Sequence, residues 1–365
     1  MKANKPQSLY IHIPFCDHIC SYCDFTKLFY NQKYEKSYLE ALKNEIKSKV
    51  TNQVSTLYFG GGTPTSLSDE GFKEILEFAA QYLDKDYEFT VEANVENLSE
   101  SKLDIMKSCG VNRLSIGVQS TCNKVLKEIG RHHSFEDAQK VVELAKSKGF
   151  NNVNIDLIYG FKNETLNDLK KDLEEFIKLD VDHISIYSLI VEKGSIFYNE
   201  KYKTQNEEDS RTYYEYIVGF LREHGYKRYE VSNFARNNKF SRHNLTYWHN
   251  QEYYGCGLGA SGYENNVRYE NTKSITTYLK GNYVSSKEEV SENDNLEYYL
   301  ITNLRLEDGF LRSEFVTKFG IDFVDKFGDK IEKFSLDKYF AISDDKVSLS
   351  DEGLIMMDFV ILKLL

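Results

Sequence analysis

Residues 8–25 read SLYIHIPFCDHICSYCDF, a short apolar run that ends in three closely spaced cysteines. The apolar run is rich in isoleucine and aromatic residues, which is typical of a buried strand. Cys16, Cys20 and Cys23 follow it in the spacing C-x3-C-x2-C. A structural zinc site is closed by four ligands, so three cysteines in this position point to a different kind of metal centre.

Five further strand patterns follow the first, and amphipathic helical patterns lie between them. The strand patterns span residues 56–62, 87–94, 113–120, 152–160 and 183–192. A strand–helix unit repeated in this way predicts parallel strands joined by right-handed crossovers. Periodicity alone leaves open whether these strands form a doubly wound sheet or a (β/α) barrel, whole or partial.

The pattern changes after about residue 230. Residues 241–266 are rich in glycine, asparagine and aromatic residues and show no helical period. From about residue 286, short helical patterns precede a strand pattern at 346–350 and a final apolar helix. We therefore expect a strand–helix core over residues 1–235, a Gly/aromatic-rich connecting segment over 236–285 and a small, mainly helical, winged-helix-like domain over 286–365.

Composition excludes several classes of protein. The 365 residues, 41 % of them apolar, are enough for a large core, and no run approaches the 18 apolar residues of a membrane span. The first residues lack the apolar stretch of a secretory signal, so we expect a cytoplasmic protein, in which close cysteines are metal ligands or redox thiols. The net charge of −11 and the absence of a basic cluster argue against a nucleic-acid partner.

The cysteine spacing favours an iron–sulfur cluster over zinc. No fourth Cys or His stands at a zinc-like interval, and His18 lies too close in the chain to its cysteine neighbours to be a fourth ligand. Three thiolates can hold three irons of a [4Fe–4S] cube and leave the fourth iron open to a small molecule. The remaining cysteines are isolated, and we expect them to be buried thiols: Cys109, Cys122 and Cys256.

At this point the sequence resembles the radical S-adenosylmethionine (SAM) superfamily, whose hallmark is C-x3-C-x2-C after the first barrel strand. The resemblance implies a partial (β/α)6 barrel of TIM type over residues 1–235. It also implies that SAM chelates the open iron through its amino and carboxylate groups, and that one electron from the reduced cluster cleaves the sulfonium.

Polar residues at the ends of the later strands agree with this resemblance, since ligands gather at the carboxyl ends of parallel barrel strands. The turn Gly60–Pro64, with sequence GGGTP, leaves its backbone bare for close approach of a ligand. Glu92 is placed to accept hydrogen bonds from ribose hydroxyls, and Arg131 could pair with a carboxylate. Gln119 and Asp156 stand at the ends of two further strands.

The resemblance narrows to the coproporphyrinogen dehydrogenase-like group of that superfamily. YIHIPFC, YCDF, GGGTPT, VEAN, IGVQS, GRHH and NIDLIYG occur in order, and HNLTYW, YYGCGLGASGY, LRLEDG and LSDEGL extend the match into the tail. The resemblance implies that the cluster is held by Cys16, Cys20 and Cys23. It implies a SAM site made of Tyr10, Phe25, Gly61, Gly62, Thr63, Glu92, Gln119, Arg131 and Asp156.

Two features favour the heme chaperones of that group, the HemW family, over its dehydrogenases. In the dehydrogenases a further cysteine follows the third ligand by two positions, whereas this chain has Phe25. The chain also carries the H-N-x-x-Y-W pattern of the chaperones, which implies a heme site. Imidazole ligates heme iron and aromatic rings stack on macrocycles, so the candidate heme residues are His243, Asn244, Tyr247 and Trp248.

The resemblance therefore implies a radical-SAM-type heme chaperone that binds a [4Fe–4S] cluster, SAM and heme and delivers heme to client apo-hemoproteins. It further implies a reductant such as flavodoxin or ferredoxin, and an association with membranes that is at most peripheral. Two alternatives stay open: an oxygen-independent coproporphyrinogen III oxidase that decarboxylates propionates, and another radical SAM enzyme. Phe25 argues against the first alternative, and the acidic charge argues against an RNA-modifying enzyme.

Overall fold

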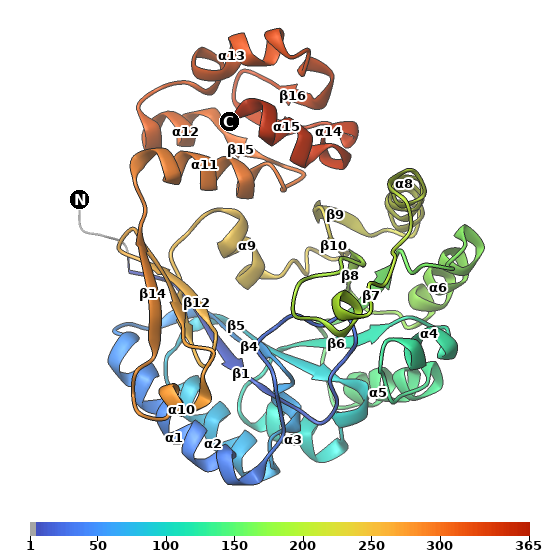
Figure 1. Ribbon diagram of the computed structural model, residues 1–365, viewed down its shortest axis with the longest axis vertical. Helices are drawn as coiled ribbons and strands as arrows, with labels where there is room; N and C mark the ends of the chain where they lie inside the picture. Colours follow the sequence, from blue (N-terminus) through green and yellow to red (C-terminus); the bar gives the residue numbers. More distant parts are fainter. Residues whose placement is uncertain (1–4) are drawn as a thin grey trace.

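The computed structural model describes residues 5–365, and its centre is a curved sheet of nine strands in the order β11-β1-β4-β5-β6-β7-β8-β10-β9 (Figure 1). The six inner strands are parallel. They are β1 (Ser8–Ile13), β4 (Val54–Gly61), β5 (Leu83–Asn94), β6 (Arg113–Gln119), β7 (Val153–Tyr159) and β8 (His183–Ser188). The prediction of a partial α/β barrel is confirmed, because in the described chain the edge strands β11 and β9 do not pair with each other.

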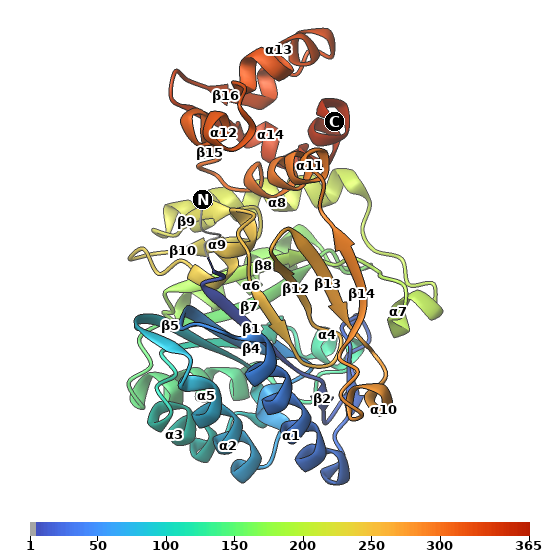
Figure 2. The same cartoon turned by 90° about the vertical axis from the view of Figure 1, so that its left-hand side faces the viewer.

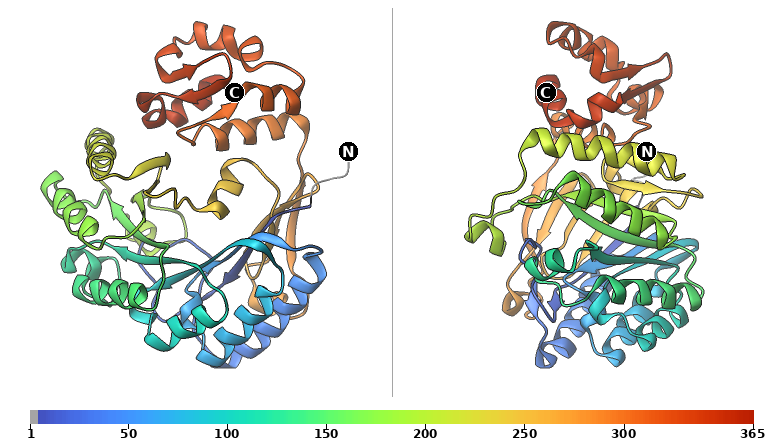
Figure 3. Two further views of the ribbon diagram at one scale, coloured as in Figure 1. Left: turned by 180° about the vertical axis from the view of Figure 1, so that it is seen from behind. Right: turned by 90° about the vertical axis from the view of Figure 1, so that its right-hand side faces the viewer.

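Helices cover the convex side of this sheet (Figure 3). They are α1 (Gln32–Lys49), α2 (Asp69–Ala80), α3 (Glu100–Ser108), α4 (Asn123–Glu128), α5 (Phe135–Ser147), α6 (Leu166–Lys178) and α8 (Glu207–Glu223). Most begin at a residue whose side chain accepts a hydrogen bond from the first turn, and Ser134 and Thr165 form complete capping boxes. One face of the sheet packs against these helices, and the other face lines the inside of the barrel. Every residue of β6 is therefore buried.

The barrel ends on one side with two antiparallel strands. β10 (Asn233–Ala235) pairs with β8, and β9 (Lys227–Glu230) pairs with β10. The short helix α7 (Ile196–Asn199) lies in the connection between β8 and α8. On the other side, β11 (Tyr254–Cys256) adds to β1 in parallel. The sheet therefore begins and ends with segments that follow the six repeats in the sequence.

A short helix, α9 (Arg242–Trp248), lies inside the curve of the sheet (Figures 1 and 3). Its first two backbone N–H groups donate to the carboxylate of Glu88, and Thr246 bonds to Ser8 through their hydroxyls, 2.7 Å apart. The expectation that residues 241–266 lack helical structure is therefore wrong for this stretch. Seven residues are too few to display a helical period, and the helix is defined instead by its cap, Ser241.

A three-stranded antiparallel sheet stands beside the barrel edge (Figure 2). It consists of β12 (Ser261–Glu264), β13 (Val267–Asn271) and β14 (Val284–Glu289), with α10 (Ile275–Tyr278) between the last two strands. The buried carboxylate of Glu45 on α1 ties this sheet to the barrel. It accepts hydrogen bonds from the Gly257 N–H at 2.8 Å, the Asn271 amide at 2.6 Å and the Tyr278 hydroxyl at 2.6 Å.

The C-terminal region has its own apolar core (Figure 1). Its helices are α11 (Glu292–Asn303), α12 (Arg312–Phe319), α13 (Phe323–Lys333), α14 (Asp351–Ile355) and α15 (Met357–Leu364). Its sheet has the order β15 (Phe310–Leu311), β17 (Lys346–Leu349), β16 (Phe340–Ile342). Arg305 connects this region to α9, with its guanidinium 4.6 Å from the ring of Trp248. Across residues 5–365, no helix is both long and apolar enough to cross a bilayer.

We predict that Glu45→Gln destabilises the fold by about 3–5 kcal/mol, because an amide cannot replace a buried carboxylate that accepts from four donors, Lys49 among them. Urea unfolding followed by circular dichroism measures this. Glu40→Gln, at an exposed position on the same helix, is the control and should change the free energy of unfolding by less than about 0.5 kcal/mol. Equal stability of the two variants would contradict the role given to Glu45.

Candidate functional site

The three cysteines lie on a loop that follows β1 and is held at both ends by backbone pairing. β2 (Phe15–Cys16) pairs in parallel with β3 (Leu28–Phe29), and this pairing holds together the two ends of the loop formed by residues 17–27. Cys16 is buried, and Cys20 and Cys23 are partly buried. All three line one cavity of about 390 Å³, which we call the cluster cavity. The sequence therefore brings three thiols to one space.

The donor set fits an iron–sulfur cube. Burial raises the pKa of Cys16 to about 11, and burial also raises the pKa of Cys23. Ligation therefore requires the metal to displace protons. Within residues 5–365, no three His, Cys, Asp or Glu side chains converge on the position of a single ion. A cube takes each thiolate on a different iron, so three thiols that line one cavity suit a cluster.

The cluster cavity also contains the strand-end residues that the sequence analysis singled out. They come from four parallel strands, the turn after β4 and one loop, and Asp156 lies in the middle of β7 and not at its end as expected. Those that line the cavity are Gly61, Gly62, Thr63, Glu92, Gln119, Arg131 and Asp156. Phe25 lines the cavity as well, from the cysteine loop. Eight of the nine expected SAM residues therefore share one space with the three cysteines.

Glu92 is fixed by its neighbours on the adjoining strand. Its carboxylate accepts a hydrogen bond from the Tyr58 hydroxyl at 2.6 Å and from the Gly61 N–H at 3.3 Å. A Cβ on Gly60 would lie 3.0 Å from this carboxyl group, so glycine there leaves the space that Glu92 occupies. Burial, with a contribution from the charge of Asp156, raises the pKa of Glu92 to about 7.

Arg131 is buried and keeps unused hydrogen-bond donors. Its Nη2 donates to the Tyr22 hydroxyl at 3.3 Å, and its Nη1 lies 3.7 Å from the Glu96 carboxylate. Neither Nε nor Nη1 has a hydrogen-bond partner among the described residues. A Cβ on Gly117 would lie 2.6 Å from Nη2, so glycine makes room for the guanidinium. A buried guanidinium with free donors beside the cavity fits the carboxylate of SAM.

Gln119 and Asp156 complete the edge of the sheet. Gln119 has φ +73°, a conformation that costs energy for a residue with a side chain, and it lies where the pairing of β6 with β7 shifts its register. Asp156 accepts a hydrogen bond from the Asn154 amide at 2.8 Å, and burial raises its pKa. The register shift at the end of β6 places Gln119 in the wall of the cluster cavity.

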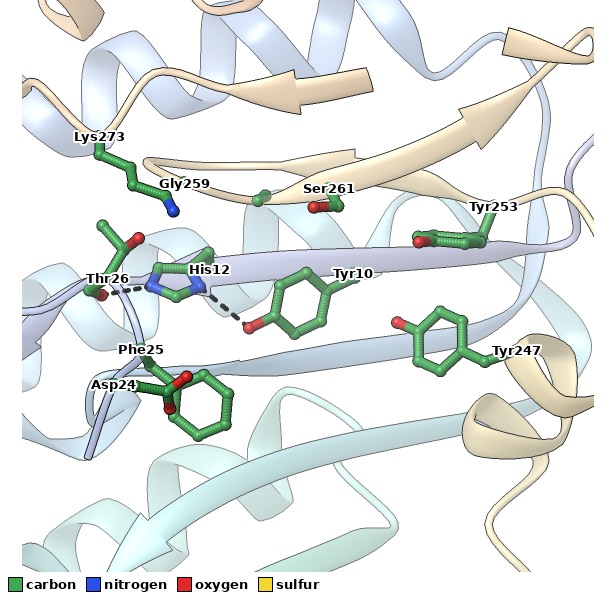
Figure 4. A pocket seen from close by; sticks show the side chains of 11 residues that line it. Tyr10, His12, Asp24, Phe25, Thr26, Tyr247, Tyr253, Gly259, Ser261 and Lys273 are labelled. Carbon is green, nitrogen blue, oxygen red and sulfur yellow. Dashed lines mark hydrogen bonds between the residues drawn. The ribbon is translucent and has the colours of Figure 1, made fainter. Parts of the chain in front are cut away.

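A second cavity of about 290 Å³ lies on the other side of the cysteine loop (Figure 4). Asp24 and Phe25 line both cavities. Tyr10, expected in the SAM site, lines this second cavity and not the cluster cavity. Its hydroxyl lies 3.0 Å from Nδ1 of His12, whose Nε2 lies 2.7 Å from the Thr26 carbonyl oxygen. Burial lowers the pKa of His12 to about 4, so the ring is neutral at pH 7.

The H-N-x-x-Y-W residues, all on α9, point to different surroundings. His243 is buried, with Nδ1 2.8 Å from the Thr56 hydroxyl and Nε2 2.7 Å from the Tyr247 hydroxyl. Burial lowers its pKa to about 3. Of the four candidates, only Tyr247 lines either cavity, the second one, whereas Trp248 packs on Arg305.

The four candidate heme residues therefore do not form one open site. Asn244 is half-buried, and its backbone N–H donates to the capping Ser241. Both ring nitrogens of His243 are occupied in this conformation, so ligation of iron by His243 requires two hydrogen bonds to break.

The other cysteines follow the expectation in two cases. Cys109 and Cys256 are buried thiols. Cys122 is exposed, so the expectation of burial is wrong there. It is the N-cap residue of α4, and such residues lie at the protein surface where the chain turns into the helix.

Two contacts near the site were not anticipated from the sequence. Asn94 donates to the Thr63 hydroxyl at 2.9 Å, which joins the end of β5 to the GGGTP turn. The imidazole rings of His18 and His132 stack with centroids 3.7 Å apart. The alternation of residues along β5 places Asn94 on the same face as Glu92, which was a usable signal, whereas nothing in the sequence relates His18 to His132.

Comparison with known proteins agrees with this geometry. Residues 10–176 match the radical SAM superfamily, and residues 290–356 match the HemN C-terminal domain. The chain is 38 % identical to the heme chaperone HemW of Lactococcus lactis (96 % of this chain, 94 % of the relative) and 36 % identical to that of Bacillus subtilis (95 % and 96 %).

A solved structure of coproporphyrinogen III oxidase (HemN) from Escherichia coli, described as a radical SAM enzyme, superposes with a TM-score of 0.85. The match covers 99 % of this chain and 90 % of that one at 22 % identity. At that identity the likeness establishes the fold alone.

We predict that Glu92→Gln makes the cofactor-free chain more stable than the wild type at pH 8, by about 1–3 kcal/mol, and equally stable at about pH 4, below the pKa of an unfolded glutamate. The folded-state pKa is raised to about 7, so the fold favours the neutral carboxyl. Its contribution to stability is therefore present at acid pH and lost as pH rises through 7. Gln keeps the neutral form at every pH.

Urea unfolding at the two pH values tests this prediction. Glu77→Gln, at an exposed position on α2, is the control and should follow the wild type at both. If Glu92→Gln shows the same pH dependence as the wild type, the raised pKa is refuted.

Proposed function

We propose, from the premise that this chain belongs to the HemW family of the radical SAM superfamily, that it takes up heme and delivers it to apo-hemoproteins while holding a [4Fe–4S] cluster and SAM. The observation that carries this proposal is the single cavity shared by the three cysteines and the strand-end residues. Phe25, which stands where the dehydrogenase branch has a further cysteine, supports the chaperone over the dehydrogenase.

Different residues of the cavity would bind the cluster and the SAM molecule. Cys16, Cys20 and Cys23 would hold the cluster, which when bound supplies one-electron chemistry and an open iron. The free donors of Arg131 would pair with the carboxylate of SAM. The bare backbone at Gly61 and the adjoining turn would accept the amino group.

The polar edge of the sheet would orient the rest of the SAM molecule. Glu92 and Asp156 are held by hydrogen bonds before any ligand arrives, from Tyr58 and Asn154 respectively. Carboxylates fixed in this way can accept hydrogen bonds from ribose hydroxyls without reordering.

The division of the chain into functional parts also supports the proposal. Residues 1–235 would carry the cluster and SAM, residues 236–285 would join the sheet edge to the second cavity, and residues 286–365 would form a separate domain. The independent apolar core of the last part is consistent with that boundary. Free thiols that bind iron need a reducing compartment, so we propose the cytoplasm, with flavodoxin or ferredoxin as the reductant.

The main competing function is that of a coproporphyrinogen III oxidase, the activity named for the E. coli structure with the same fold, which the resemblance implies would decarboxylate propionates. Both functions need the cluster and SAM, so those cofactors do not separate them. Heme uptake separates them, because a chaperone retains heme and passes it on, whereas the oxidase converts a substrate and releases carbon dioxide.

We predict that Cys20→Ala abolishes assembly of the cluster, because the two cysteines left cannot hold the cube. Anaerobic reconstitution followed by iron and sulfide analysis measures this. Cys122→Ala removes an exposed thiol outside the cavity and should load as fully as the wild type. A full complement of iron in Cys20→Ala would remove the basis of the proposal.

We predict that the cluster-loaded chain binds heme close to one equivalent and transfers it to an apo-globin, while coproporphyrinogen yields no carbon dioxide. Anaerobic titration followed by Soret absorbance measures binding, and the absorbance of the refilled globin measures transfer. Absence of specific heme binding, together with release of carbon dioxide in the presence of SAM and dithionite, would favour the oxidase instead.

A further inference from the structure

The histidines of this chain divide into two groups by the state of their rings. Four are buried: His12, His133, His183 and His243. Both ring nitrogens of His12, His183 and His243 are hydrogen-bonded. His133 is bonded at Nε2, its Nδ1 lies 3.1 Å from the Glu96 carboxylate without hydrogen-bond geometry, and the residue lines neither cavity. Four are exposed: His18, His132, His224 and His249. Only an imidazole with a free nitrogen can ligate iron without breaking existing bonds, so the exposed group contains the available ligands.

His18 is the one exposed histidine that lines either described cavity, and it lies on the wall of the cluster cavity. Among residues 5–365, neither of its ring nitrogens has a hydrogen-bond partner. Its ring stacks on that of His132 with an interplanar angle of 22°. The backbone N–H of His132 donates to the Glu96 carboxylate at 2.9 Å, which fixes the position of the residue that carries the second ring. The ring of His18 is therefore held in one orientation by stacking, while both of its nitrogens are available to a ligand.

Large apolar side chains stand exposed on the wall of the same cavity. Phe25 is 64 % exposed and Ile190 is 66 % exposed, and both line the cluster cavity. They come from the cysteine loop and from the segment after β8, which belong to separate parts of the sheet order. Apolar side chains that gather at a cavity without a protein partner mark a place for a flat apolar ligand.

The size of the cavity places such a ligand at its mouth. At about 390 Å³ the space is near the lower end of small-molecule sites, which run from about 300 to 1,000 Å³. A cluster and SAM would occupy it. A tetrapyrrole is larger than SAM and cannot enter the remaining volume, so it would lie across the opening.

We propose that heme lies over the mouth of the cluster cavity, against Phe25 and Ile190, and that His18 ligates its iron. The ring nitrogen donates its lone pair to the iron and displaces the water, hydroxide or chloride that holds that axial position in free hemin, with no change in oxidation state. His132 is a positioning residue that holds the ligand ring by stacking. This inference rests on the proposed function and assigns it a site different from His243.

His18→Ala tests the site. The cluster-loaded protein is titrated anaerobically with hemin, and the axial ligand is identified by electron paramagnetic resonance and near-infrared magnetic circular dichroism. We expect His18→Ala to bind hemin about 10- to 100-fold more weakly and to lose the imidazole signature. His224→Ala, an exposed histidine on neither cavity, should match the wild type, and His243→Ala should keep the signature.

His18→Met keeps the test decisive if the alanine variant loads its cluster poorly. A thioether can replace imidazole on heme iron and raises the heme potential. We expect a methionine ligand signature, which a merely structural role of His18 would not produce. Wild-type binding with an unchanged spectrum in both His18 variants overturns the inference and leaves the chaperone function intact. No specific binding by the wild type instead overturns the proposed function itself.

Discussion

The parallel pairing of six strands is the constraint on which the site depends. Residues far apart in the chain, such as Gly61 at the carboxyl end of β4 and Asp156 in the middle of β7, line one cavity because their strands run parallel in one sheet. The open form of the barrel follows from the same pairing, since β11 and β9 end the sheet without meeting. The concave side is filled by α9, whose backbone donates to Glu88.

Buried polar groups explain how the cavity wall keeps its shape. The Glu92 and Asp156 carboxyl groups each accept a hydrogen bond from a neighbouring residue, and the unmatched donors belong to Arg131. A buried donor without a partner costs free energy, and Arg131 is the residue with such donors, among those described, that also lines the cluster cavity. His243 differs from Arg131, because both of its ring nitrogens are hydrogen-bonded within the protein. We therefore assign His243 to the stabilisation of the fold and Arg131 to ligand binding.

Much of the fold and of the cluster cavity could be predicted from sequence, because buried parallel strands are continuous apolar runs and their ends are marked by polar residues. The cysteine spacing and the position of Glu92 were predicted in this way. The state of His243 could not be predicted, because its partner Thr56 lies 187 positions away and only tertiary packing joins them. The exposure of Cys122 was not predicted, because the hydrophobic pattern does not show where a helix begins. The helix α9 was not predicted, because it is too short to show a helical period.

The β2–β3 pairing has a consequence for the order of events in maturation. Leu28 donates to the Pro14 carbonyl at 2.7 Å and Tyr30 to the Cys16 carbonyl at 2.9 Å, so the loop between them is closed by the polypeptide alone. Much of its configurational entropy is lost when the barrel folds. Small zinc domains, in contrast, fold only when metal arrives. The ordering that cluster binding has to bring about is therefore confined to one loop whose two ends the polypeptide itself holds.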